Sequence, residues 1–192
     1  MWARASAGSS PRESFRTLQT QAVTAMTIHT ILHYPDKRLR IPGEPVTDFG
    51  DELAKLVDDM AETMYAAPGV GLAAPQIGIS WRIFVIDVSS EGPSELRAFV
   101  NPEIIEKDGK VAWEEGCLSF PGVHQEIKRA ERVKVRAQDA TGESFELEAD
   151  GLLAIAIQHE NDHLEGKLMV DHLSPLKRRS VHRTMVKRAA AS

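Results

Sequence analysis

Gln-His-Glu-Asn-Asp-His at residues 158–163 is the stretch on which the fold prediction rests, because it places two histidines four residues apart. If this stretch is helical, His159 and His163 lie on one face, about 40° apart around the helix axis. Both imidazoles can then bind one metal ion with Glu160 beside it, which is an arrangement used in metal-dependent hydrolysis. The alternative interpretation is a solvated helix with two structural histidines, since the pattern also arises by chance.

The residues around this stretch favour a helix. An apolar run over 152–157 leads into His159 without an internal proline. Asp150 is a candidate N-cap, and Gly166 stands where a C-cap glycine is expected. The sequence therefore predicts a largely buried helix, in which two aligned histidines need a cation or hydrogen bonds as partners.

The third ligand is not found where zinc proteases usually supply it. Met169 stands three residues after Gly166, and no glutamate follows Glu165. Cys117, the only cysteine of 192 residues, remains the candidate, in a turn-like segment over 114–121. A Cys, His, His set with water as the fourth ligand gives the open site of a catalytic ion, whereas the alternative is a small buried hydrophobic residue.

Gly-Val-Gly-Leu-Ala-Ala-Pro-Gln-Ile-Gly at 69–78 is a second segment of interest, because its small residues permit close backbone approach to a ligand. The phosphate-binding patterns Gly-Lys-Ser/Thr and Gly-x-Gly-x-x-Gly are absent, so a nucleotide site is not expected. A tight turn between two elements is the alternative interpretation.

Three segments, in this order, resemble the signature motifs of the peptide deformylase family. They are Gly-Val-Gly-Leu-Ala-Ala-Pro-Gln at 69–76, Glu-Gly-Cys-Leu-Ser at 115–119 and Gln-His-Glu-Asn-Asp-His at 158–163. The similarity extends from about Ile31 to Lys177. The resemblance implies a bacterial-type, iron-dependent hydrolase that removes the formyl group from the formylmethionine of nascent polypeptides and releases formate.

By this resemblance, Cys117, His159 and His163 would hold one divalent ion, Fe²⁺ natively, with Zn²⁺, Ni²⁺ or Co²⁺ as replacements. The ion would make hydroxide available near neutral pH, and Glu160 would carry the proton from water to the departing amine. The side-chain amide of Gln76 and the backbone N–H of Leu118 would stabilise the tetrahedral oxyanion.

The resemblance also implies how the peptide is held. An apolar pocket for the methionine side chain would be formed by Val70, Leu152, Ile155 and the stem of His159. Backbone hydrogen bonds to the peptide would come from Gly71 and Gly116. One departure concerns His124, where many relatives carry an arginine that helps to hold the peptide backbone. Binding of extended peptides is the property that this departure puts in doubt.

Composition and periodicity predict the remaining architecture. With 42% hydrophobic residues and a net charge of −5, the chain can bury one core and shows no general case for nucleic-acid binding or a membrane span. Helical spacing marks 51–65, and strand patterns mark 81–88, 98–107 with a turn at Asn101-Pro102, 132–137 and 145–149. We predict an α+β fold, with mixed or antiparallel sheets packed around the central motif-bearing helix and a C-terminal helix.

The two ends of the chain are predicted separately from residues 26–192, which we expect to form a single domain. Residues 1–25 are expected to be a flexible leader or upstream extension, with a transit peptide as the alternative. The expected compartment is the cytoplasm, or an organelle in the second case. Residues 177–188 carry six cations and no acid, which predicts a solvated helix or, by the resemblance, a ribosome-binding helix.

Two other classes of function remain in competition with a deformylase. A metalloprotease would cleave internal peptide bonds, and the missing downstream ligand argues against it. A non-enzymatic metal-binding module would hold the metal without labile water, and Glu160 and Gln76 argue against it.

Overall fold

The computed structural model describes residues 26–90 and 93–191, so the expected N-terminal extension over 1–25 lies outside the described residues. The elements follow in the order η1 (Lys37–Arg40), α1 (Asp51–Ala66), β1 (Gly71–Ala73), η2 (Ala74–Ile77), β2 (Ile83–Ile86), β3 (Arg97–Asp108), β4 (Val111–Gly116), β5 (His124–Arg129), β6 (Arg132–Gln138), β7 (Ser144–Asp150), α2 (Gly151–Leu164), η3 (Met169–His172) and α3 (Pro175–Ala189).

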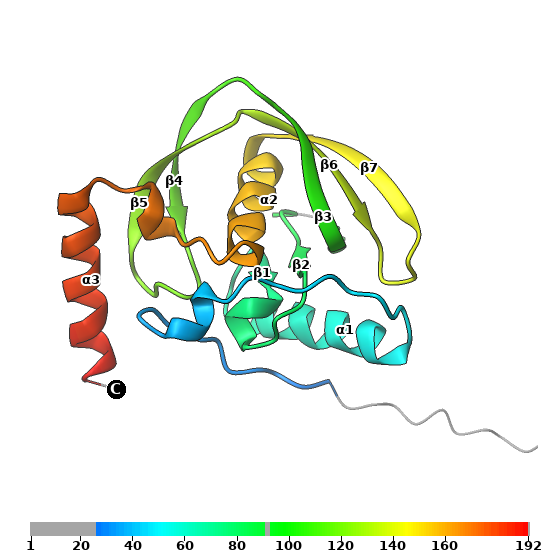
Figure 1. Cartoon of the computed structure of the whole chain (residues 1–192), viewed down its shortest axis with the longest axis horizontal. Coiled ribbons are helices and arrows are strands. Elements are labelled where there is room, and N and C mark those ends of the chain that lie inside the picture. The colour runs from blue at the N-terminus through cyan, green and yellow to red at the C-terminus, as the bar shows by residue number, and fades with distance from the viewer. Residues whose placement is uncertain (1–25, 91–92, 192) are drawn as a thin grey trace, which may run out of the picture.

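The strands form two antiparallel sheets that bend around one helix. One sheet has five strands in the order β1-β2-β3-β6-β7, and the other pairs β4 with β5. Figure 1 shows α2 in the middle, with the long strands arching over it and α1 on the opposite side. The predicted α+β class and the central position of α2 are confirmed, and all pairings between these strands are antiparallel.

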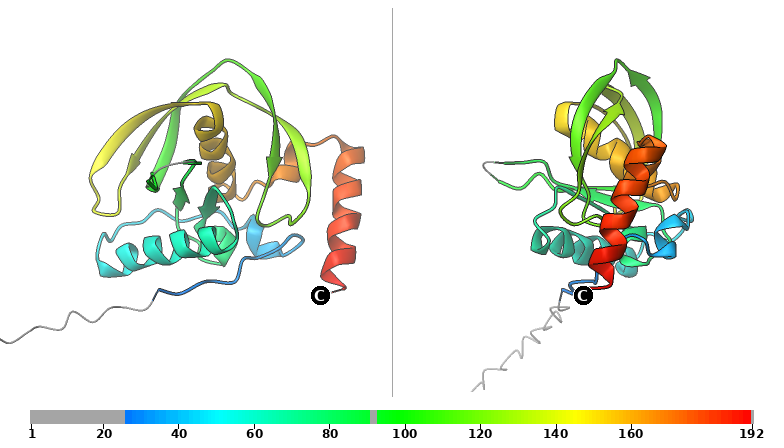
Figure 2. Two further views of the ribbon diagram at one scale, coloured as in Figure 1. Left: turned by 180° about the vertical axis from the view of Figure 1, so that it is seen from behind. Right: turned by 90° about the vertical axis from the view of Figure 1, so that its left-hand side faces the viewer.

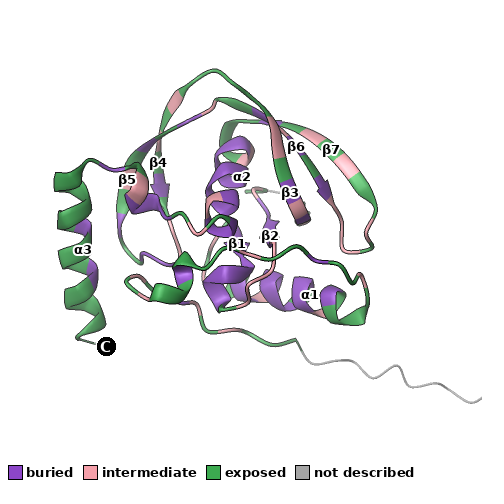
Figure 3. Ribbon diagram, viewed as in Figure 1, coloured by how far each residue is buried: buried purple, intermediate pink, exposed green. Residues whose placement is uncertain are grey.

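Helix α2 is buried on most of its surface, which explains its continuous apolar sequence (Figure 3). Its small and branched side chains pack against β2, β3, β6 and β7 in a cluster that includes Phe84, Phe99 and Val135. The helix is followed by Gly166 at φ 67°, where an added Cβ would lie 2.6 Å from the carbonyl oxygen of Arg40. Glycine is therefore required at this position both for its backbone conformation and for its size.

Helix α3 lies at the edge of the molecule, on the side of β5 (Figures 1 and 2). Val181 and Met185 are its buried residues, and they join a cluster with Phe120, Ile127 and two residues of η3, Met169 and Val170. The rest of the helix is largely exposed, including most of its cations. None of the described helices is long and apolar enough to cross a membrane.

Two local predictions differ from the structure. β3 runs through Asn101-Pro102 without ending, because the register shift between Val100 and Glu103 absorbs the irregularity as a bulge. The side-chain amide of Asn101, whose φ is 50°, exchanges hydrogen bonds with the backbone of Val46 and so stabilises the bulge. The first half of the turn-like segment 114–121 is also strand, because residues 114–116 pair with β5.

Candidate metal centre and its cavity

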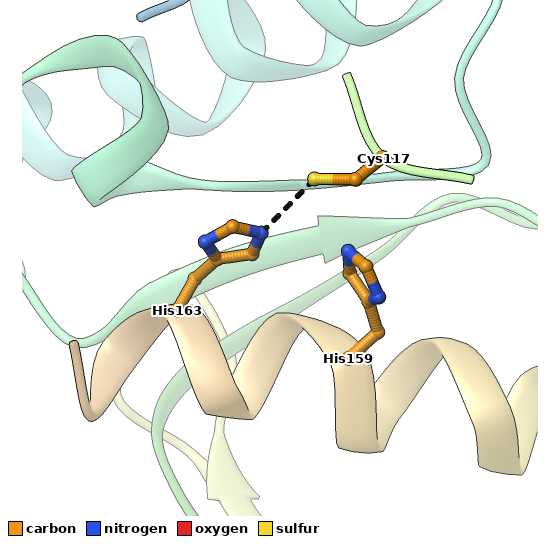
Figure 4. Close-up of side chains that lie close together, drawn as sticks. All are labelled: Cys117, His159 and His163. Carbon is orange, nitrogen blue, oxygen red and sulfur yellow. Dashed lines mark hydrogen bonds between the residues drawn. The ribbon is translucent and has the colours of Figure 1, made fainter. Parts of the chain in front are cut away.

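Three side chains that can bind a metal ion converge beside α2. Cys117 directly follows β4, and His159 and His163 lie one turn apart on the helix. Their ligand atoms all lie within 4.8 Å of one another, and Cys117 Sγ is 3.4 Å from His163 Nε2. Figure 4 shows both imidazole rings rising from the helix toward the sulfur. Within residues 26–90 and 93–191, no other His, Cys, Asp or Glu set forms such a group.

The protonation of His163 suits a metal ligand. The residue is 1% exposed, and its Nδ1 has no hydrogen-bond partner among the described residues. Burial and the positive charge of His159 lower the pKa of His163 to about 3, so this imidazole is neutral at physiological pH. A neutral imidazole facing a cysteine sulfur offers the mixed nitrogen and sulfur donors that borderline divalent metals bind.

The orientation of His159 is set by Glu115. Its Nδ1 lies 2.8 Å from Glu115 Oε2, and an ionised carboxylate can only accept, so Nδ1 carries the proton. The other ring nitrogen, Nε2, is thereby left as the lone-pair donor. Burial opposes the charged form, but the charge of Cys117 and the hydrogen bonds to Cys117 and Glu115 raise the pKa of His159 well above 6.5. A cation and a proton therefore compete for this imidazole.

Glu160 is a buried carboxyl group beside the two histidines. It is 5% exposed, and its Oε2 has no hydrogen-bond partner among the described residues. Burial raises the pKa of Glu160 to about 7, with the negative charge of Glu115 adding to the effect and the positive charge of His159 opposing it. A carboxyl group with such a pKa can accept and return a proton near neutral pH.

The two glycines at the start of the 69–78 segment make room for functional side chains. An added Cβ on Gly71 would lie 2.5 Å from Glu160 Oε1, and one on Gly69 would lie 2.7 Å from Leu118 Cδ1. Close backbone approach was predicted for this segment, and here the backbone approaches side chains of the protein itself. A turn alone, the alternative interpretation, does not describe a segment that forms β1 and η2.

Gln76 directs its amide NH₂ group toward the loop after β4. Its Oε1 accepts a hydrogen bond from the backbone N–H of Ala73 at 2.8 Å, which fixes the rotation of the amide. Its Nε2 then donates to Ser119 Oγ at 3.2 Å and lies 3.6 Å from Cys117 Sγ. The amide donor is thus held at the metal-binding side of the loop.

A cavity of about 550 Å³ opens beside these residues and collects most of the sequence-predicted site. Its lining includes ten of the eleven predicted residues: Val70, Gly71, Gln76, Gly116, Cys117, Leu118, Leu152, Ile155, His159 and Glu160. The eleventh, His163, does not line the cavity, and its Nε2 lies 3.4 Å from Cys117 Sγ. Val70 and Leu152 are 45% and 38% exposed, so they form an apolar rim and not part of the packed core.

Two strand edges border this cavity. β1 is the terminal strand of the five-stranded sheet and β4 pairs only with β5 among the described strands, so each keeps one edge unpaired. Gly71 on β1 and Gly116 on β4 both contribute to the cavity lining. An extended peptide between these edges could pair with both strands.

Sequence reasoning missed the buried residues that hydrogen-bond to Glu115 and so help to hold His159 in place. Arg129 on β5 makes hydrogen bonds to Glu115 and Asp162, which are 14 and 33 residues away in the chain. The buried Glu115 has a pKa lowered to about 2, because the hydrogen bond with His159 and the charge of Arg129 outweigh the effect of burial. No local pattern signals these pairings, since the alternation of β5 places Arg129 on the same face as the buried Ile127 but does not indicate its carboxylate partners.

Comparisons with known proteins place the chain in a family. The sequence profile of the family described as polypeptide deformylase matches residues 28–179. Peptide deformylase 1 from Burkholderia multivorans is 55% identical over 169 residues, which cover 88% of this chain and 93% of that protein. Among the function classes considered, these matches support the deformylase.

Solved structures agree with the sequence comparison. The crystal structure of a peptide deformylase from Legionella pneumophila superimposes with a TM-score of 0.82 at 49% identity, covering 86% of this chain and 97% of that chain. The peptide deformylase from Ehrlichia chaffeensis in complex with actinonin gives a TM-score of 0.81 at 38% identity, covering 85% and 98%. The chain therefore belongs to the peptide deformylase family, metal-dependent hydrolases that remove the N-formyl group from nascent peptides.

Proposed function

We propose that deformylation takes place in the cavity beside α2, with Cys117, His159 and His163 as metal ligands and Glu160 as the group that moves the proton. The observation that carries this proposal is the position of Glu160: a buried carboxyl group with one oxygen free of partners among the described residues, next to the three ligand side chains. A structural metal site has no use for such a group, whereas hydrolysis requires one.

The metal is proposed to be Fe²⁺ in the native protein, with Zn²⁺, Ni²⁺ and Co²⁺ as functional replacements. Support comes from the donor set, because one cysteine sulfur and two imidazole nitrogens suit several borderline divalent metals. When bound, such an ion supplies a Lewis acid that makes water a nucleophile near neutral pH and polarises the carbonyl group.

Glu160 is proposed to handle the proton at both ends of the reaction. Its carboxylate takes a proton from the attacking water as oxygen bonds to the formyl carbon, and passes it to the amide nitrogen as the C–N bond breaks. The products are formate and a peptide with a free amino terminus. The pKa of about 7 supports both transfers, since the group is partly ionised at neutral pH.

The oxyanion of the tetrahedral species is proposed to receive hydrogen bonds from the Gln76 side chain and the Leu118 backbone. Support for Gln76 comes from the hydrogen bond with Ala73, which aims the NH₂ group toward the loop of Cys117. A donor fixed before the reaction stabilises charge more effectively than one that must rotate into place, and each is typically worth about 3–4 kcal/mol.

The peptide is proposed to lie between the free edges of β1 and β4, hydrogen-bonded to Gly71 and Gly116. Its methionine side chain would then contact Val70, Leu152 and Ile155, which line the cavity. A flexible thioether suits an apolar wall of this kind.

We also propose that residues 26–192 act as a single domain in the cytoplasm, with an organelle as the alternative if residues 1–25 are a transit peptide. Ribosome binding is proposed for α3, whose exposed cations could contact phosphates. Of the six cations over residues 177–188, Arg178 and Arg188 hydrogen-bond to backbone carbonyls of this chain, which leaves Lys177, Arg179, Arg183 and Lys187 better placed for a partner.

Formate release from a formyl-methionyl peptide by Glu160→Gln, measured together with metal content, tests the proposed function. Since the amide cannot take a proton from water, turnover should fall by about 10²- to 10⁴-fold while one ion per chain is retained. Glu165→Gln, at the exposed end of the same helix, is the matched control and should keep both properties. Normal turnover by Glu160→Gln with metal bound would overturn the role assigned to Glu160.

A further inference from the structure

A continuous chain of hydrogen-bonded side chains connects one histidine of the candidate metal centre to the protein surface. It runs in the order His159, Glu115, Arg129, Asp162 and His172. His159 Nδ1 lies 2.8 Å from Glu115 Oε2, and Glu115 Oε1 lies 2.7 Å from Arg129 Nε. Asp162 Oδ2 lies 2.6 Å from Arg129 Nη1 and 2.7 Å from His172 Nε2. These residues come from β4, β5, α2 and η3, so the chain links four elements.

The guanidinium of Arg129 is the rigid centre of this chain. Its side chain is 5% exposed, and that of Glu115 is 3% exposed. Nε and Nη2 donate to the two oxygens of Glu115, while Nη1 donates to Asp162. A guanidinium is planar. The hydrogen bond from Nη1 to Asp162 therefore fixes the plane in which Nε and Nη2 of Arg129 donate to Glu115. The oxygen that accepts from His159 is one of these two Glu115 oxygens.

Asp162 links Arg129 to His172 within this chain of side chains. It lies in α2 directly before His163 and three residues after His159, yet it is not one of the grouped ligand side chains. Its Oδ2 accepts hydrogen bonds from Arg129 and from His172. Burial raises the pKa of Asp162, but the hydrogen bond from His172 and the charge of Arg129 lower it to about 2, so the group is an anion at neutral pH.

His172 forms the outer end of the chain. Its side chain is 31% exposed, and its Nε2 lies 2.7 Å from the Asp162 carboxylate. Without His172, the surface-facing side of the Asp162 carboxylate would be in contact with water. The N–H donor of His172 reduces the number of orientations that this carboxylate can adopt. His172 belongs to η3, which directly precedes the α3 segment.

We propose that Asp162, supported by His172, is a positioning residue for metal binding: it holds Arg129, and through Arg129 and Glu115 it fixes the ring of His159 with Nε2 left for the ion. This inference rests on the proposed ligand set of Cys117, His159 and His163. It adds residues that do not touch the ion and that act on its affinity through the hydrogen-bonded side chains of Arg129 and Glu115.

Metal affinity of the apoprotein provides the test, measured as Co²⁺ and Zn²⁺ binding by competition with a chelator. Asp162→Asn and Glu115→Gln should each weaken binding by about 10- to 100-fold, as expected when the group that orients a ligand is removed. The double variant should be little worse than Glu115→Gln alone, because both substitutions break the same chain. Additive effects, or an unchanged affinity in Asp162→Asn, would overturn the inference.

Asp59→Asn is the matched control. Asp59 is another buried carboxylate with a cationic partner, Lys55 at 2.5 Å, and it accepts from the backbone N–H of Thr27 at 2.8 Å. Its substitution should lower stability to an extent comparable with Asp162→Asn while leaving metal affinity unchanged. An equal loss of metal affinity in Asp59→Asn would mean that general destabilisation, and not positioning, explains the effect.

Two further measurements cover the case in which Asp162→Asn does not fold. Because His172 is exposed, its variants should fold, and His172→Phe should bind metal about 2- to 5-fold more weakly than His172→Gln, which keeps an N–H donor. Nitrogen chemical shifts of apoprotein histidines, recorded at a pH high enough for His159 to be neutral, should show His159 protonated at Nδ1 in the parent protein and in a mixture of tautomers in His172→Phe. Equal affinities and equal shifts contradict the inference, whereas failure of the parent protein to bind metal contradicts the proposed function itself.

Discussion

Gly71 and Glu160 fit against each other so closely that a methyl group on residue 71 would lie 2.5 Å from the Glu160 Oε1 atom. Gly71 is not among the residues with positive φ, so alanine is allowed by the backbone and excluded only by Glu160. The position of Glu160, the proposed proton carrier, therefore depends on Gly71, which is far away in the sequence.

Gly71→Ala should therefore impair catalysis by displacing the Glu160 carboxylate. We expect kcat/KM for a formyl-methionyl peptide to fall by about 100-fold, which is typical of a catalytic group moved by about 1 Å. Metal content should remain at one ion per chain. Gly50→Ala is the control, because its Cβ would meet only Asp48 at 3.4 Å, and unchanged activity in Gly71→Ala would show that the contact does not position Glu160.

Gln76→Leu should slow turnover without releasing the metal. Removal of a preorganised donor to the oxyanion predicts a decrease in kcat of about two to three orders of magnitude. The change also leaves the buried N–H of Ala73 without its acceptor, so the free energy of unfolding should fall by about 1–3 kcal/mol. Steady-state kinetics and urea denaturation separate the two effects. Near-normal kcat in the folded variant would remove Gln76 from the mechanism.

Asp87→Asn should reduce stability at neutral pH and lose this effect in acid. Burial raises the pKa of Asp87, but hydrogen bonds from Ser89, Ser94 and Tyr65 outweigh it and hold the pKa well below 3.8. A folded-state pKa below the unfolded value contributes stability above the unfolded pKa, and this contribution is lost as the pH falls through the folded pKa. The parent and variant should thus differ by about 1–3 kcal/mol near pH 7 and converge as the pH falls below 3.8 and through the folded pKa.

Urea denaturation across this pH range measures the difference for Asp87→Asn. Asp58→Asn, at an exposed position of α1, is the control and should show no comparable loss at any pH. A constant difference between parent and Asp87→Asn from neutral to acid pH would contradict the assignment, because it would mean that ionisation of Asp87 does not contribute to stability.

Reversing two charges on α3, Arg179→Glu with Arg183→Glu, should weaken ribosome association and leave deformylation of a short peptide unchanged. The salt dependence of binding should become shallower by about one unit of logarithmic slope for each phosphate that the helix no longer binds. Truncation of the helix is a poorer test, since Val181 and Met185 are buried in the cluster around Phe120. Lys107→Glu with Lys110→Glu is the control of equal charge, and equal effects of the two pairs would count against a specific surface on α3.

Local patterns were sufficient to predict α2, the helix that carries both histidines, and the hairpin of β6 and β7. The apolar run before His159 and the alternation in 132–137 reflect burial on α2 and the half-buried hairpin of β6 and β7, and both are properties of consecutive residues. β3 shows the limit of prediction from local patterns. Pro102 is tolerated at a bulge that depends on hydrogen bonds between Asn101 and Val46, and Val46 is far from this strand in the sequence. A turn was expected there because the partner that stabilises the bulge cannot be inferred locally.

The candidate site also combines residues that could be predicted from the sequence with residues that could not. The motifs and the family resemblance predicted eleven site residues, and ten of them line the cavity. The ion pair between Glu115 and Arg129 and its extension to Asp162 could not be predicted, because the three residues come from separate elements. Their pairing depends on how the β4–β5 sheet packs against α2.

X-ray absorption of the anaerobically purified protein at the metal edge tests the ligand set most directly, with total metal content measured on the same sample. We predict one ion per chain coordinated by one sulfur and two imidazole nitrogens, and loss of the sulfur contribution in Cys117→Ser. A parent spectrum without sulfur, or an ion whose coordination is the same in Cys117→Ser, would contradict the assignment of Cys117, His159 and His163 as the metal centre.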